Sequence, residues 1–221
     1  MQDATNSAGK RPAEFRYGAV LVLTLVVVMF AIIAPAADWS SAVVLAMQSA
    51  SLVVVIATSH MRPERRRVQT SVGACAAAAL VLVVGLGDVP DWLMLTGGGL
   101  LSLAVPLALV GGLVRLVRTQ GVTVQAVTGS LAIYLLVGLL FAWIVGLAAH
   151  LDPDPFFANG AEATASSRVY YSFTVLTTTG FGDYTAASPV GHALAVMEML
   201  GGQLYLVTVI GVVVGSFGRR R

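Results

Sequence analysis

The sequence predicts an all-α integral membrane protein with six transmembrane helices and a short re-entrant helix and loop between the fifth and the sixth. Three observations predict this fold class. The 221 residues are 57% hydrophobic and 11% charged, whereas soluble domains are roughly a quarter charged. The apolar residues fall in runs of about 20, the length that crosses a bilayer. Basic residues are concentrated in alternate connections between those runs.

Six apolar runs are long enough to span a membrane. The first ends in Ala34-Pro35-Ala36 and could pass for a signal peptide with a small-residue cleavage site. A secretory apolar core is usually about 7–15 residues, which is shorter than this run, so we expect a retained helix. The predicted spans are residues 17–37, 41–59, 70–87, 92–114, 122–149 and 189–217.

The charges of the connections predict the orientation. Basic residues lie before the first span, between the second and third, between the fourth and fifth, and after the sixth. The remaining connections are mostly acidic and carry Arg168 as their basic residue. Because positive charge is retained on the cytoplasmic side, we expect a multi-pass protein of the plasma (inner) membrane with both termini cytoplasmic. Basic residues lie at span ends and do not form a nucleic-acid footprint. They are Lys10, Arg11, Arg16, Arg62, Arg65, Arg66, Arg67, Arg115, Arg118, Arg219, Arg220 and Arg221. The arginines at 62–67 and 219–221 could bind anionic lipid head groups.

The spans divide the chain into three parts. Residues 1–16 form a cytoplasmic tail, residues 17–118 a four-helix membrane domain, and residues 119–221 a two-helix domain with the long loop. In number and orientation these spans resemble the layout of voltage-gated cation channels, in which the first four form a voltage sensor. Such a sensor needs arginines at every third position inside the fourth span, but Arg115 and Arg118 stand at its cytoplasmic end. We expect no strong voltage dependence, and no nucleotide- or calcium-binding module after the sixth span.

The loop at residues 150–188 has two parts. Residues 151–167 are polar and form a turret that contains two prolines, an asparagine and a glycine. Residues 168–178 suit a short helix, which Ser166 or Ser167 could cap. This helix is too short to cross the membrane, so the sequence predicts a re-entrant element, tolerated at that depth only when it is buried in protein or lines water.

The segment Thr178-Thr179-Gly180-Phe181-Gly182-Asp183 follows the short helix. Glycines that alternate with larger residues allow backbone conformations in which successive carbonyl groups face the same way. Such carbonyls can replace the hydration shell of an ion, and one chain supplies one oxygen per level. Thr178 adds a hydroxyl for the innermost site, while Phe181 is expected to point away from the axis and pack behind the loop.

Residues 170–184 resemble the pore helix and selectivity filter of the potassium channel superfamily, and the resemblance extends to residue 217. It implies a bacterial potassium channel with a two-helix pore, assembled with three identical subunits as a homotetramer. Thr179 and Phe181 stand where the family usually has Val and Tyr, and Gly-Phe-Gly variants occur in potassium-selective relatives. The resemblance gives the K⁺ ligands as the backbone carbonyls of Thr178, Thr179, Gly180, Phe181 and Gly182, with K⁺ as the permeant ion and no cofactor.

The resemblance also implies supporting roles around this filter. Asp183 would accept a hydrogen bond from Tyr170 at the outer mouth. Thr174 stands where some bacterial relatives have a glutamate, so a carboxyl pair with Asp183 is absent here. Gly202, 19 residues after Asp183, occupies the position of the gating hinge, although a glycine in a membrane helix can equally serve close packing.

Glu198 is the one carboxylate inside a predicted span. Charged groups in a membrane are costly and usually pair or face water. One interpretation places Glu198 behind the filter, protonated and hydrogen-bonded to a pore-helix hydroxyl such as Ser172 or Thr174. The alternative is a water-facing anchor without a role in gating.

No cluster of residues has metal-ligand or nucleophile–base spacing, so we expect no enzyme. Cys75 is single, and His60, His150 and His192 fall near span ends. Two alternatives to a potassium channel remain. The altered filter allows a weakly selective cation channel, and a non-conducting assembly protein or transporter subunit is also possible. Potassium transporters built from pore-like repeats carry several such loops in one chain, and we find no second one.

Overall fold

The computed structural model describes residues 16–35, 38–58 and 90–217, and these residues are largely helical. The predicted third span, the arginines at 62–67 and 219–221, His60 and Cys75 lie outside the described residues. The elements are α1 (Arg16–Ile33), α2 (Asp38–Thr58), α4 (Asp91–Gln120), α5 (Val124–Leu151), α6 (Ala165–Leu176), α7 (Pro189–Tyr205), the π-helical turn η1 (Leu206–Ile210) and α8 (Gly211–Phe217).

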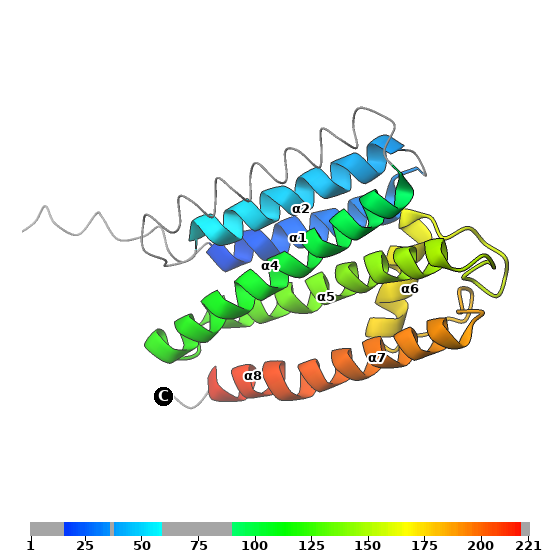
Figure 1. The fold of residues 1–221 in the computed structure, drawn as a ribbon. Coiled ribbons are helices and arrows are strands. Elements are labelled where there is room, and N and C mark those ends of the chain that lie inside the picture. The colour runs from blue at the N-terminus through cyan, green and yellow to red at the C-terminus, as the bar shows by residue number, and fades with distance from the viewer. Residues whose placement is uncertain (1–15, 36–37, 59–89, 218–221) are drawn as a thin grey trace, which may run out of the picture.

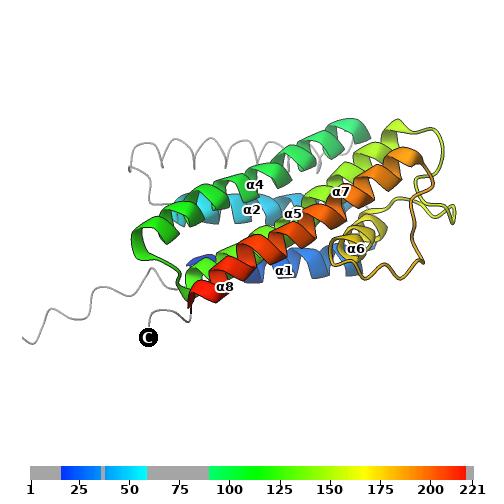
Figure 2. The ribbon, with the colours of Figure 1, turned by 90° about the horizontal axis from the view of Figure 1, so that it is seen from below.

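Among the described residues, three helical segments are long and apolar enough to cross a membrane. They are Asp91–Thr119, Val124–Leu151 and the continuous Pro189–Ser216, which joins α7, η1 and α8. Shorter apolar stretches lie in α1 at Tyr17–Ile33 and in α2 at Ala42–Val55. These helices run roughly side by side, whereas the short α6 lies across them near one end (Figures 1 and 2). The architecture is therefore that of an α-helical membrane protein.

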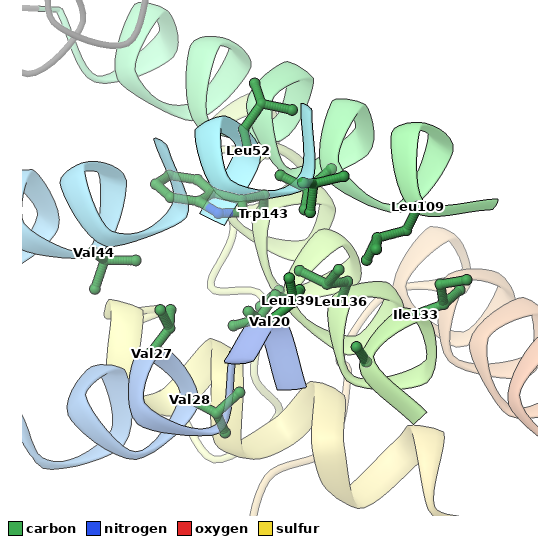
Figure 3. Close-up of a cluster of buried hydrophobic side chains, with 14 of the residues drawn as sticks. Val20, Val27, Val28, Val44, Leu52, Leu109, Ile133, Leu136, Leu139 and Trp143 are labelled. Atoms are coloured by element: carbon green, nitrogen blue, oxygen red, sulfur yellow. The ribbon is translucent and has the colours of Figure 1, made fainter. Parts of the chain in front are cut away.

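Helix α5 is the centre of the packing and contacts α1, α4, α6 and α7. A cluster of buried aliphatic side chains joins it to α1, α2 and α4 (Figure 3). Trp143 of α5 belongs to this cluster, and a Cβ atom added at Gly98 of α4 would lie 2.6 Å from its ring. The glycine thus lets α4 approach the tryptophan closely. The cluster includes Val20, Val27, Val44, Leu52, Leu109, Leu136 and Leu139.

Helix α4 is longer than the predicted fourth span, which ended at residue 114. It continues as one helix through Arg115 and Arg118 and stops before Gly121, whose φ of 73° favours glycine. The two arginines therefore lie on the last turns of the helix rather than in a loop. The predicted span ended where the apolar residues end, whereas the helix itself continues to Gln120, because polar residues can also be helical.

The predicted cap of the short helix is wrong. The N-cap of α6 is Thr164, whose hydroxyl accepts a hydrogen bond from the Ser167 N–H at 3.2 Å. Ser166 instead donates to the Ile32 carbonyl of α1 at 2.7 Å, and Ser167 donates to the Glu162 carbonyl at 2.9 Å. Several hydroxyl residues in a row can each cap a helix, and the partners that surround them decided which one does.

Candidate functional site

The loop that follows α6 hangs from the last turn of that helix. The N–H groups of Thr179 and Gly180 both donate to the Thr174 carbonyl, at 2.9 and 3.1 Å. The N–H of Thr178 donates to the Val175 carbonyl at 2.9 Å. The last carbonyls of a helix lack partners within it, so these bonds satisfy the end of α6 and hold the start of the loop against it.

The backbone of the loop alternates in handedness. Thr178, Gly180 and Gly182 have positive φ angles of 56°, 51° and 84°, while Thr179 and Phe181 do not. Glycine adopts this region readily, but a β-branched residue there is a strained outlier. Thr178 is the one non-glycine residue with positive φ in the described ranges. Such strain is found at functional sites when the surrounding structure holds it.

Hydroxyl groups brace the inner end of the loop. Thr177 donates to the Phe173 carbonyl at 2.7 Å, and its hydroxyl oxygen lies 2.8 Å from that of Thr179. The Thr178 hydroxyl donates to the Thr177 carbonyl at 2.7 Å and accepts from Gln203 Nε2 at 3.2 Å. Gln203 belongs to α7, so this contact ties the strained threonine to the last apolar span.

The outer end of the loop is held by Asp183 and by aromatic rings. The Asp183 carboxylate accepts from the Tyr184 N–H at 3.1 Å, and it raises the pKa of the Tyr170 hydroxyl through hydrogen bonding and through its charge. Phe181 is 70% exposed, and its ring stacks on that of Tyr170 at a centroid distance of 6.4 Å. Tyr170 thus stacks on Phe181, and the Asp183 carboxylate acts on its hydroxyl.

Glu198 of α7 lies buried against α6. It is 1% exposed, and its Oε1 atom is hydrogen-bonded to the Ser172 hydroxyl. The hydroxyl of Thr174, the other expected partner, donates to the Tyr171 carbonyl of its own helix at 2.8 Å. Of the two, Ser172 is therefore the residue that the structure brings to Glu198, and a water-facing Glu198 does not agree with this burial.

Gly202 lies one helical turn further along α7 and packs on the end of α6. A Cβ atom there would lie 2.8 Å from both the carbonyl oxygen and a side-chain carbon of Leu176. The absence of a side chain is what allows this close approach. The helix becomes irregular only beyond this point, in the π-helical turn η1.

These elements have a counterpart among known proteins. Residues 130–218 match the family model described as "Ion channel". The matched stretch, here named the ion channel segment, begins within α5 and includes α6, the loop, α7 and α8. It supports a channel function and a membrane-embedded protein, and favours a role without enzymatic activity. No curated protein matches the chain.

Two sets of contacts in the ion channel segment were not predicted from the sequence, because they join residues that are distant along the chain. The polar turret is pinned by its phenylalanines: Phe157 is 1% exposed, pairs as an isolated antiparallel bridge with Ala186, and packs edge-on against Tyr171 and Tyr184. Asn159 of the turret donates to the Asp183 carbonyl at 2.8 Å. The pair of phenylalanines beside prolines was the one available signal.

The second set of contacts that was not predicted from the sequence is made by Arg168. This residue was expected in the connection between the fifth and sixth spans, at the start of the short helix, and its burial was not predicted. It is 8% exposed, and its guanidinium lies 5.8 Å from the centre of the Trp143 ring. Gly146 of α5 makes room for it, since a Cβ atom there would lie 2.0 Å from Nη1. In this way the ion channel segment buries a cation between α5 and α6.

Two tyrosine hydroxyls link α5 to α6 and to α7. Tyr134 of α5 donates to the Leu176 carbonyl at 3.1 Å, and Tyr205 of α7 donates to the Ser130 carbonyl at 2.8 Å. Their rings stack with centroids 6.2 Å apart. No group of three or more His, Cys, Asp or Glu residues in the described ranges could hold a metal ion.

Proposed function

We propose that the protein is the subunit of a potassium-selective channel that conducts K⁺ passively through a homotetrameric pore. The observation that carries the proposal is the positive φ at every second residue, Thr178, Gly180 and Gly182, in a loop suspended from α6 within the ion channel segment. An extended backbone sends successive carbonyls to opposite sides. Regular alternation of handedness lets them face one side, as a ring of carbonyl ligands requires.

A complete ring needs several chains. One loop offers one carbonyl per level, whereas a K⁺ ion needs oxygen atoms on all sides. The loop residues 177–183 are exposed in the single chain. A Cβ atom added at Gly180 or Gly182 would meet nothing within 4 Å. This open face suits the ion path and further copies of the chain, and the potassium channel resemblance makes their number four.

The exposed faces of α7 support the same assembly. The buried residues of α7 are Gly191, which packs on Ala186 and Phe156, and Glu198 and Gly202, which face α6. Large apolar side chains on its other faces are exposed and would meet neighbouring subunits, lipid or the inner pore. They include Val196, Met197, Leu200 and Leu204. Gly202 remains the proposed gating hinge. Because it packs on Leu176, bending there would have to separate α7 from the end of α6.

The membrane arrangement is part of the proposal. Helix α6 has 12 residues, so it is about 18 Å long and does not reach across a hydrocarbon core of about 30 Å. We therefore place it as a re-entrant pore helix in a six-span protein of the plasma membrane, with both termini cytoplasmic and the domain division at residues 16 and 118. Basic residues at the cytoplasmic ends would meet anionic lipids.

Flux through liposomes tests the function. The purified protein should carry K⁺ much faster than Na⁺, and Gly180→Ala or Gly182→Ala should abolish this preference. An alanine at left-handed φ costs about 1–2 kcal/mol and would shift the ligand carbonyls. Gly160→Ala is the matched control, because Gly160 also has positive φ, 73°, but lies in the turret. It should leave selectivity unchanged.

The flux assay also separates the alternatives. Equal K⁺ and Na⁺ flux that the filter substitutions abolish would indicate a weakly selective cation channel, the outcome that Thr179 in place of the usual valine favours. Absence of flux for both ions, with correctly assembled protein, would favour a non-conducting assembly protein or a transporter subunit.

A further inference from the structure

Three helices of the ion channel segment meet at one buried hydroxyl group. Ser172 Oγ of α6 lies 2.6 Å from the Gly138 carbonyl oxygen of α5 and is also hydrogen-bonded to Glu198 Oε1 of α7. Ser172 is 0% and Glu198 1% exposed, and Gly138 is buried as well. All three residues are therefore shielded from solvent.

The number of protons limits how these contacts can be made. A serine hydroxyl carries one proton, a carbonyl oxygen only accepts, and an ionised carboxylate only accepts. With an ionised Glu198, the single proton of Ser172 could serve one contact, and the other would press two acceptor oxygens together. With a protonated Glu198, the carboxyl donates to Ser172 and Ser172 donates to Gly138, so both contacts are hydrogen bonds.

The groups around Glu198 do not favour its ionised form. The titratable side chains that interact with it are Tyr134 on α5 and Tyr171 on α6, and neither is a cation. Within the described ranges no basic residue acts on it. A buried carboxylate without a cationic partner is strongly disfavoured and normally takes up a proton.

We infer that Glu198 is a neutral carboxylic acid that donates its proton to Ser172, and that Glu198–Ser172–Gly138 forms a proton-dependent clasp between α7, α6 and α5. Glu198 is a positioning residue, since its contacts are to the pore helix and not to the loop. The clasp lies one turn from Gly202, on the same buried face of α7. Loss of the proton would loosen α7 from α6 within one helical turn of the Thr174 carbonyl that holds the loop. The effect on conduction rests on the proposed channel function, whereas the protonation state does not.

Infrared spectroscopy of the purified full-length protein tests the proton directly. We expect the C=O stretch of a buried carboxylic acid at neutral pH, with a shift in D₂O. The band should disappear in Glu198→Gln and persist in Glu162→Gln, the matched control at an exposed glutamate. Absence of the band, or its persistence in Glu198→Gln, would overturn the assignment.

A stability series tests the clasp. Glu198→Gln should unfold at the wild-type temperature at neutral pH, because its amide N–H can donate to Ser172 as the acid does. Glu198→Ala and Ser172→Ala should unfold about 5 °C lower. As pH rises, the wild type should lose stability when the carboxyl ionises, and Glu198→Gln should not.

The two proposals can fail separately. If Glu198→Gln is as unstable as Glu198→Ala, the ionised form holds the helices together and the clasp is wrong. If the wild type carries no ion but the infrared and stability results are as expected, the clasp stands and the channel function fails. Where flux is present, Ser172→Ala should reduce it and Glu198→Gln should not.

Discussion

Helices α5 and α7 are both apolar spans of the ion channel segment, yet the chain treats them differently. In the most apolar window of α5, 56% of the residues are buried, whereas the corresponding share in the span that begins with α7 is 11%. Helix α5 is covered by α1, α4, α6 and α7, while α7 contacts α5 and α6 along one stripe. A single chain therefore completes the environment of α5 and leaves that of α7 open to other molecules.

This difference indicates that α5 mainly stabilises the single chain, whereas the open faces of α7 are available for assembly. Apolar side chains on α5 contribute to the fold of one subunit. Those on the open faces of α7 are not covered by the other described helices, and in the proposed channel they would be buried by lipid or by other subunits. Equal substitutions in the two helices should therefore act on different measurable properties, and the following predictions use that contrast.

The largest effect is expected from a matched pair of leucines. Leu139 of α5 is 1% exposed and Leu204 of α7 is 62% exposed. Leu139→Ala should lower the free energy of unfolding by about 2–5 kcal/mol, because it leaves a cavity in the core. Leu204→Ala should change it by no more than about 0.5 kcal/mol but reduce the fraction of tetramer. Denaturation of the monomer in detergent and chemical cross-linking measure the two quantities. Equal losses of monomer stability would contradict the contrast.

The next effect concerns Gly202, at which α7 packs on the end of α6. Gly202→Ala should destabilise the protein by about 1–3 kcal/mol through overpacking, since the Leu176 backbone cannot move aside easily. Gly201→Ala is the control, because a Cβ atom there meets nothing within 4 Å. Thermal unfolding together with K⁺ flux reports both. A larger defect for Gly201→Ala would show that packing on Leu176 is not what requires a glycine.

The smallest effect is expected at the tyrosine between α7 and α5. Tyr205→Phe retains the ring stacked on Tyr134 and removes the hydrogen bond to Ser130. The loss should be about 0.5–1.5 kcal/mol, the net value of one hydrogen bond. Thermal unfolding of the purified protein measures it. A change in flux without a change in stability would instead point to a role in gating.

Local patterns were enough to predict much of the site. Residue spacing predicted that glycines would give the loop its positive φ at Gly180 and Gly182. For the lone carboxylate in a span the sequence left two interpretations open, and the one that hydrogen-bonds Glu198 to a hydroxyl of the short helix agrees with the structure. Both follow from rules that act within a few residues: the steric freedom of glycine and the cost of charge in a membrane.

Other features depended on partners distant in sequence. Thr164 rather than Ser166 caps α6 because Ser166 finds the Ile32 carbonyl. Arg168 is buried because Gly146 and Trp143 form a space for it. Spacing along one segment contains no information about which distant residue will lie opposite.

The sequence by itself determined the α-helical membrane class, the order of the apolar helices that the structure describes and the loop with its alternating glycines, because hydropathy and backbone sterics are local properties. The tertiary structure alone decided that one serine joins α5, α6 and α7, that Gly202 serves the contact with Leu176, and that α7 keeps most of its apolar surface exposed. These outcomes depend on which surfaces meet, and side chains brought together by packing share hydrogen bonds that no single segment specifies.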